Sequence, residues 1–180
     1  MEQRPELVFR SGHRIRLLAE GSDGEGDYLR LEHQLPKCGR QAGPHWHPVL
    51  GERWTVREGK LRFRIDGTET VATPGTTVNA PARAVHEFWN ESADTVIEHE
   101  IRPPLRHWEM FTLWRNLDVT GKTTRSGVPR GPLALALLWD YQDGYIAGIP
   151  VWIQRVALGT LARVARLADY ERRWATLDAT

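Results

Sequence analysis

Hydrophobic and polar residues alternate with a period of two through much of the first hundred positions. The clearest case is the stretch ERWTVREGKLRFRIDGTETV, in which Leu61, Phe63 and Ile65 alternate with arginines. Such alternation is typical of a β-strand with one face in the core and the other in solvent. Asp66-Gly67 then predicts a hairpin turn, because glycine accepts the positive φ that such turns require.

Other short segments of the same part of the chain have strand character. They are 13–19, 27–35, 85–89 and 95–101. A glycine-rich turn, GSDGEGD at 21–27, separates the first two, and Pro74-Gly75 and 79–83 predict further turns. Many short strands at close spacing predict a β-sandwich or β-barrel.

The pattern changes after Pro103-Pro104. In 105–117, LRHWEMFTLWRNL, apolar residues recur at helical spacing, and a polar loop follows at 118–131. The segments 132–144 and 150–177 are rich in Ala and Leu, and each begins with a proline, which is favoured in the first turn of a helix. We therefore predict a β-domain over 1–103 and a helical extension over 104–180.

Composition excludes several classes of protein. A net charge of +1 argues against a protein built to bind nucleic acid, and we expect no such partner. No apolar run approaches the roughly 18 residues of a membrane span. Cys38 is the single cysteine, which excludes a disulfide framework and predicts a reducing, cytoplasmic location. Arg-rich, Lys-poor usage suggests a bacterial source.

Two histidines lie close together in GRQAGPHWHPVLGERW. On a strand, His45 and His47 share a face, because residues two apart point the same way. Pro48 and the glycine at 51 interrupt the strand, so Glu52 can return to that face. His86 arrives on a later strand, and closure of the sheet would bring it opposite the others. Three imidazoles and a carboxylate suit a divalent ion and leave one or two coordination positions open.

These residues fall into a spaced pattern that resembles the two motifs of the cupin superfamily. The first comprises Gly39, His45, His47, Glu52 and Gly59, and the second comprises Gly67, Pro74-Gly75, Pro81, His86 and Asn90. The pattern covers roughly residues 25 to 102 and is similar to that of small bacterial single-domain cupins.

The resemblance implies a mainly β fold, a cupin-type antiparallel β-barrel (jelly roll), here followed by a C-terminal α-helical extension. It implies that His45, His47, Glu52 and His86 bind a divalent metal ion (Fe, Mn, Ni or Zn). It favours an oxygen-dependent, dioxygenase-like reaction on a small organic substrate, with Glu52 as a catalytic base. A non-redox isomerase or cyclase and a non-catalytic binding module remain alternatives, because the fold hosts all three.

Four further residues have candidate roles. His99 faces the interior if Ile97 and Ile101 do, and it would then be an acid–base group or a partner of a metal ligand. Trp54, Phe63 and Phe88 are candidates for a substrate pocket, although filling a small barrel is the simpler role for Trp54 and Phe88. We expect the other histidines, at 13, 33 and 107, to be structural or exposed.

The helical extension holds too many apolar residues to be a solvated appendage. We expect it to pack on the barrel or to join two subunits, and we predict a homodimer, also because Trp46 and Trp89 face outward by parity. Peripheral contact with a membrane is the less favoured alternative.

Overall fold

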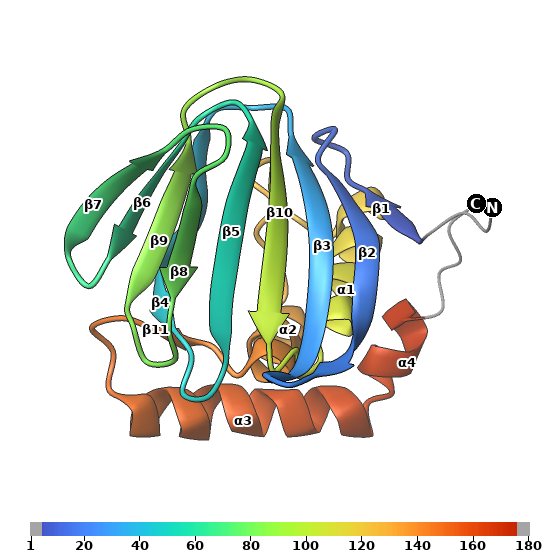
Figure 1. Cartoon of the computed structure of the whole chain (residues 1–180). Helices are drawn as coiled ribbons and strands as arrows, with labels where there is room; N and C mark the ends of the chain where they lie inside the picture. Colours follow the sequence, from blue (N-terminus) through green and yellow to red (C-terminus); the bar gives the residue numbers. More distant parts are fainter. Residues whose placement is uncertain (1–4, 176–180) are drawn as a thin grey trace. The chain divides into compact units, whose positions relative to one another are not determined.

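The computed structural model describes residues 5–175, and these form two compact units that divide after Pro104. The first unit consists of antiparallel strands. They are β1 (Glu6–Val8), β2 (Arg14–Asp23), β3 (Gly26–Leu35), β4 (Gly39–Trp46), β5 (Gly51–Glu58), β6 (Leu61–Ile65), β7 (Thr68–Ala72), β8 (Thr77–Ala80), β9 (His86–Asn90) and β10 (Thr95–Arg102). One sheet has the order β1-β2-β3-β10-β5-β8, and β4-β9-β6-β7 form the other (Figure 1). The predicted fold class, mainly antiparallel β structure followed by helices, is confirmed.

The two sheets meet through aromatic side chains. Trp54 on β5 lies 5.2 Å from Phe63 on β6 and 5.7 Å from Phe88 on β9, measured between ring centroids. Trp54 and Phe63 are buried in a cluster of aliphatic side chains from both sheets. Contacts of this kind hold a sandwich together, because ring pairs add to the free energy gained by burial.

Strand β6 has the predicted alternation. Leu61 and Phe63 are buried, whereas Arg62 and Arg64 between and beyond them face outward and pair with Glu69. The turn to β7 has positive φ at both central residues, 47° at Asp66 and 82° at Gly67, as a two-residue hairpin of this kind requires.

The outward face of the second sheet is not a bare apolar surface. Trp89 on β9 lies under the guanidinium groups of Arg40, Arg62 and Arg64, at 5.2, 4.2 and 5.4 Å from its ring. Cations over an aromatic face keep the ring covered. Trp89 therefore no longer supports the predicted homodimer.

The glycine-rich turn predicted at 21–27 is shorter than expected. β2 continues to Asp23 and β3 begins at Gly26, so only two residues join the strands. Arg102 pairs with Asp23 at 2.7 Å and donates a hydrogen bond to the carbonyl of Gly26. A contact from β10, distant in sequence, thus extends a hairpin whose glycines alone predict a loop.

Asn90 and Gly59, two residues of the spaced pattern, have structural roles near strand ends. Asn90, which is buried, donates hydrogen bonds to the carbonyls of Leu35 and Lys37. Gly59 has φ +84°, and a Cβ there would lie 2.2 Å from Oγ1 of Thr95. Glycine is required at 59 for both reasons.

The second unit is helical. It comprises α1 (His107–Val119), α2 (Pro132–Gln142), the short strand β11 (Tyr145–Ile146), α3 (Val151–Leu167) and α4 (Tyr170–Ala175). Two of the predicted helices differ from expectation. Leu105 has φ +48°, which a right-handed helix does not allow, so α1 starts at 107 and runs on to 119. The segment predicted over 150–177 breaks at Asp169, which has φ +53°, and its last two residues lie outside the described part.

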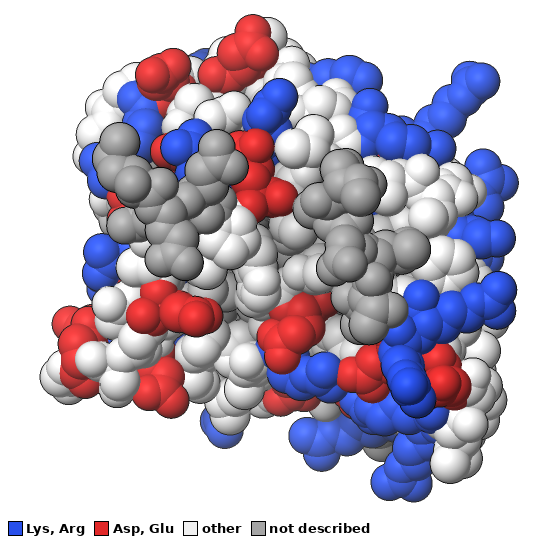
Figure 2. Space-filling model, turned by 90° about the vertical axis from the view of Figure 1, so that its right-hand side faces the viewer, with Lys and Arg blue, Asp and Glu red and all other residues white. Residues whose placement is uncertain are grey.

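Within residues 5–175, no helix combines the length and the apolar character that a bilayer crossing needs. Figure 2 shows one face of the molecule, on which both basic (Lys, Arg) and acidic (Asp, Glu) side chains are exposed. Both signs of charge together agree with the net charge of +1.

Candidate metal centre

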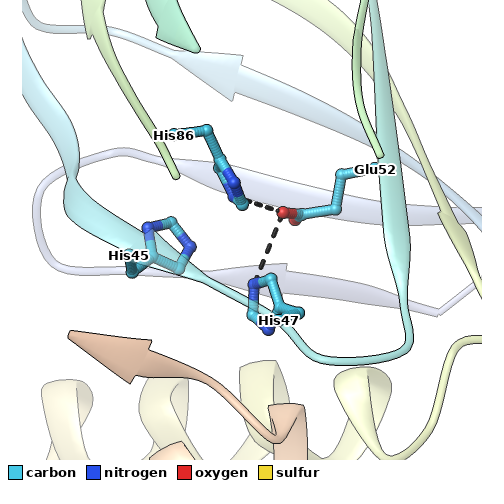
Figure 3. Close-up of side chains that lie close together, drawn as sticks. All are labelled: His45, His47, Glu52 and His86. Atoms are coloured by element: carbon cyan, nitrogen blue, oxygen red, sulfur yellow. Dashed lines mark ion pairs between the residues drawn. The ribbon is translucent and has the colours of Figure 1, made fainter. Parts of the chain in front are cut away.

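Four side chains from both sheets and from the turn after β4 converge inside the first unit (Figure 3). His45 lies near the end of β4 and His86 at the start of β9, where the two residues are paired across the sheet. His47 lies in the turn after β4, and Glu52 is the second residue of β5. We call these four residues the histidine–glutamate cluster.

The turns on either side of the cluster are tied to each other. The backbone N–H of Arg83 donates a hydrogen bond to the carbonyl of His47 at 2.7 Å. Arg83 has φ +71°, a conformation that is uncommon for a residue with a Cβ. This contact holds the turn that leads into His86 against the turn that carries His47.

The ligand-type atoms of the cluster lie within 4.8 Å of one another. Oε2 of Glu52 is 2.7 Å from Nε2 of His86 and 3.5 Å from Nε2 of His47. These three residues are buried, whereas His45 is partly exposed. His45 is therefore the residue of the cluster that is accessible to solvent.

Backbone carbonyls orient two of the imidazoles. Nδ1 of His45 lies 2.8 Å from the carbonyl of Gly43, and Nδ1 of His86 lies 2.9 Å from that of Ala84. A carbonyl only accepts, so Nδ1 carries the proton in both rings. In the neutral form of each ring, Nε2 then has its lone pair available.

The surroundings shift the pKa values of Glu52, His45 and His86 in different directions. Burial raises the pKa of Glu52, but its contacts with His47, His86 and His99 outweigh burial and hold that pKa well below its usual range. Burial lowers the pKa of His45 to about 4, so this ring is neutral at pH 7. Burial also lowers the pKa of His86, but its contact with Glu52 prevails and raises it.

The arrangement fits a cation. Nε2 of His86 and Oε2 of Glu52 are buried, and neither makes a hydrogen bond of acceptable geometry although they lie close together. Lone pairs of three imidazoles and a carboxylate meeting at one place form a nitrogen–oxygen donor set of the kind that borderline divalent ions prefer. The cluster could therefore hold a metal ion.

His99 on β10 lies on the inward face together with Ile97 and Ile101. Its Nε2 lies 3.0 Å from Oε1 of Glu52, and its ring stacks on that of Trp54 with an interplanar angle of 18°. His99 thus touches the carboxylate oxygen that faces away from His47 and His86. His99 is therefore a partner of Glu52 on the side opposite His47 and His86.

The sequence analysis missed a contact of this histidine. Nδ1 of His99 lies 3.3 Å from Nε2 of His33, which is buried on β3 and for which we expected only a structural or exposed position. His33 shares strand parity with Leu29, Leu31 and Leu35, and this pattern would have placed it inside. No sequence pattern relates it to β10.

The candidate pocket residues are Trp54, Phe63 and Phe88, and of these Trp54 lies beside a residue of the cluster. Trp54 lies 5.6 Å from His86, and Phe63 stacks on Phe88 at 5.4 Å between ring centroids. The three rings contact one another as part of the packing between the sheets. His107 is buried in α1 of the second unit.

Comparisons with known proteins relate part of the chain to one described family. A profile of the family described as "Cupin domain" matches residues 32–99, which include the whole cluster. Among solved structures, the chain is similar to KdgF from Halomonas sp. (15% identity, 54% of this chain and 84% of that chain, TM-score 0.47). It is also similar to an RmlC-like cupin from Shewanella frigidimarina (18%, 56% and 85%, 0.46) and to a sugar phosphate isomerase of a cupin superfamily from Silicibacter pomeroyi (17%, 56% and 71%, 0.45). No curated protein matches the chain.

Proposed function

We propose that the histidine–glutamate cluster binds one divalent metal ion and that the protein is a metal-dependent enzyme, which the match of the cupin-domain profile to residues 32–99 supports. Its substrate is a small organic molecule. The reaction that we propose is oxygen-dependent and dioxygenase-like, on an enol, a diketone or a phenol.

One observation carries the metal site. With Nδ1 of His86 committed to the carbonyl of Ala84, Nε2 faces Oε2 of Glu52 at 2.7 Å without a hydrogen bond of acceptable geometry. Two electron-rich atoms so close together and out of water need positive charge between them. Either a proton on His86, whose pKa is raised by Glu52, or a metal ion can supply that charge, and we propose the metal ion because two further imidazoles converge on the same place.

Each residue of the site has a distinct task. His45, His47 and His86 would hold the ion through Nε2, and Glu52 would hold it through Oε2. A bound divalent ion supplies a Lewis-acidic centre with positions open to oxygen atoms of the substrate. Glu52 is ionised at neutral pH, and Oε2 could accept a proton from a substrate when it does not bind the ion. Trp54, which lies 5.6 Å from His86 in the packing between the sheets, helps to keep water from the inner side of the cluster.

The first experiment tests the metal site. Chelator-treated protein is titrated with Fe²⁺, Mn²⁺, Ni²⁺ and Zn²⁺, and we expect one ion per chain in wild type and loss of that ion in His47→Gln. His107→Gln, which changes another buried histidine outside the cluster, is the control and should bind as wild type does. Equal binding by His47→Gln would refute the assignment.

The second experiment separates three classes of function. The metal-loaded protein is incubated with enols, diketones and phenols while dissolved oxygen and product are both followed. Oxygen uptake with product supports the dioxygenase-like reaction, and product without oxygen uptake indicates an isomerase or a cyclase. Metal binding without turnover of any compound in the panel argues for a binding module.

We also propose that the chain forms a homodimer. The support comes from α3, which exposes large apolar side chains, among them Trp152 (69% exposed) and Leu167 (89%). Exposed apolar surface of this kind often marks an interface between proteins.

A further inference from the structure

A row of imidazole rings leads away from the carboxylate of the cluster. Nε2 of His99 lies 3.0 Å from Oε1 of Glu52, and Nδ1 of His99 lies 3.3 Å from Nε2 of His33. Nδ1 of His33 in turn lies 3.2 Å from Nε2 of His13. His99 and His33 each use Nε2 on the side of Glu52 and Nδ1 on the other side, and His13 joins the row through Nε2.

The strands of the first sheet build this row. β10 pairs with both β5 and β3, and in that register His99 lies opposite Trp54 on one side and Leu31 on the other. His33 is two residues beyond Leu31 on the same buried face. His13 precedes β2, where it stacks on Phe9 at 5.1 Å and is partly exposed. The row therefore runs from the core toward the edge of the sheet.

The chemistry of the end groups gives the row a direction. An ionised carboxylate only accepts hydrogen bonds, so Nε2 of His99 must donate to Glu52. In a neutral His99, Nδ1 is then an acceptor and Nε2 of His33 must donate to it. The same reasoning makes Nδ1 of His33 the acceptor for Nε2–H of His13.

Burial supports neutral rings in the outer part of the row. Desolvation by burial lowers the pKa of His33 well below its usual value, and it lowers the pKa of His13 to about 4. Both rings are therefore neutral at pH 7, as an ordered row of single tautomers requires.

We propose that His99, His33 and His13 form a directional hydrogen-bond chain, with the proton of every ring on Nε2, that fixes the carboxylate of Glu52. His33 and His13 are then positioning residues, although neither touches the cluster. The chain occupies Oε1 of Glu52 and leaves Oε2 directed at His86 and His47. The effect of this hydrogen-bond chain on metal affinity rests on the proposed metal site. The existence of the hydrogen-bond chain does not.

The size of the effect follows from known cases of such partners. Residues that orient a ligand from outside typically change metal affinity by about 10-fold to 100-fold when they are replaced. His33 acts through one intermediate ring, so we expect the lower end of that range, about 10-fold.

The first test reads the tautomers directly. The full-length ¹⁵N-labelled, metal-free protein is studied at pH 7.5 by long-range ¹H–¹⁵N correlation NMR, with each histidine assigned from its single substitution. We expect His99, His33 and His13 each to show a protonated Nε2 and an unprotonated Nδ1. An Nδ1–H tautomer of any of the three, a doubly protonated ring, or exchange between tautomers would overturn the proposal.

The second test measures Zn²⁺ affinity by competition with a chromophoric chelator. His33→Leu removes the donor to His99 and should weaken Zn²⁺ binding about 10-fold, whereas His33→Gln keeps both a donor and an acceptor and should bind within about 3-fold of wild type. Leu31→Val, on the same buried face of β3, controls for lost packing and should bind as wild type does.

Equal affinity of His33→Leu and Leu31→Val would overturn the positioning role, and so would equal weakening in all three variants. If one of the variants does not fold, the tautomer measurement on wild type still decides. Failure of wild type to bind Zn²⁺ or any other ion would instead count against the proposed function. The tautomer measurement would then still test whether the hydrogen-bond chain of His99, His33 and His13 exists.

Discussion

Oε2 of Glu52 lies 2.7 Å from Nε2 of His86, while Oε1 of the same carboxylate lies 3.0 Å from Nε2 of His99. The two oxygen atoms thus have different partners. One belongs to the cluster that faces His45 and the solvent, and the other belongs to the histidines of the first sheet. Because a hydrogen bond holds one oxygen of the carboxylate, the direction of the other oxygen is also set. Residues outside a metal site orient its ligands in this way.

Glu52→Gln should remove the charge of the cluster and keep its shape. We expect Zn²⁺ affinity to fall by at least about 100-fold, since even outer partners of metal ligands change affinity by 10-fold to 100-fold. Glu87→Gln is the matched control, because Glu87 is also a buried carboxylate but pairs with Arg64 and Arg40. Metal content after dialysis checks both, and an unchanged content in Glu52→Gln would remove this carboxylate from the site.

Gly59→Ala should destabilise the first unit more than Gly67→Ala. Both glycines have positive φ, +84° and +82°, so both substitutions place alanine in a strained conformation. At 59 the added Cβ would also meet Thr95 at 2.2 Å and Ser92 at 2.7 Å, whereas nothing lies within 4 Å of it at 67. We expect a loss of about 1–2 kcal/mol in the free energy of unfolding at 67 and about 2–4 kcal/mol at 59. Urea unfolding measures both, and equal losses would show that the close contact has no cost.

Arg83→Gly should stabilise the protein. Arg83 is exposed and has φ +71°, so its side chain adds strain in the turn before β9. Glycine removes that strain and keeps the backbone N–H that bonds to His47, for an expected gain of about 0.5–1 kcal/mol. Arg83→Ala keeps the strain and should give no such gain. A loss of stability in Arg83→Gly would mean that the guanidinium group itself stabilises the turn.

The sequence predicts most of the cluster because His45, His47 and Glu52 lie within eight residues of one another. His45 and His47 share a face by strand parity, and Pro48 and Gly51 mark the turn that returns Glu52 to them. The bulges in β4 between Arg40 and His45 do not affect this result, because the pairing of His45 with His86 lies beyond them.

The rest depends on contacts between distant segments. The contact of His99 with His33 follows from the pairing of β10 with β3, and no periodicity within either strand specifies that register. The length of the hairpin at Gly24 depends likewise on Arg102. The break at Asp169 between α3 and α4 follows from a single positive φ, which the Ala-rich and Arg-rich composition around it conceals.

Acid should destabilise the protein partly through His13. Its pKa is lowered to about 4 in the folded chain and is near 6.5 in the unfolded chain, so the unfolded state binds more protons between these values. The stability from this group is fully present above pH 6.5 and is lost as the pH falls toward 4. Between pH 7 and pH 5, we expect His13→Gln to lose about 1–2 kcal/mol less unfolding free energy than wild type. Urea unfolding at pH 7 and at pH 5 measures the loss for each protein. Equal losses in wild type and His13→Gln would show that folding does not lower the pKa of His13.

The exposed apolar face of α3 should hold the proposed homodimer together. Trp152 and Val156 are one helical turn apart, and Leu167 lies eleven residues further, close to three full turns, so the three share a side of the helix. They are 69%, 65% and 89% exposed, and burying side chains of this size stabilises an interface by about 1.5–3 kcal/mol each. We expect light scattering at about ten micromolar to give twice the chain mass for wild type and the chain mass for Trp152→Ser with Leu167→Ser. Val71→Ser, which changes a half-exposed valine on β7, should remain dimeric. A monomeric wild type would refute the homodimer, and a dimeric double variant would place the interface elsewhere.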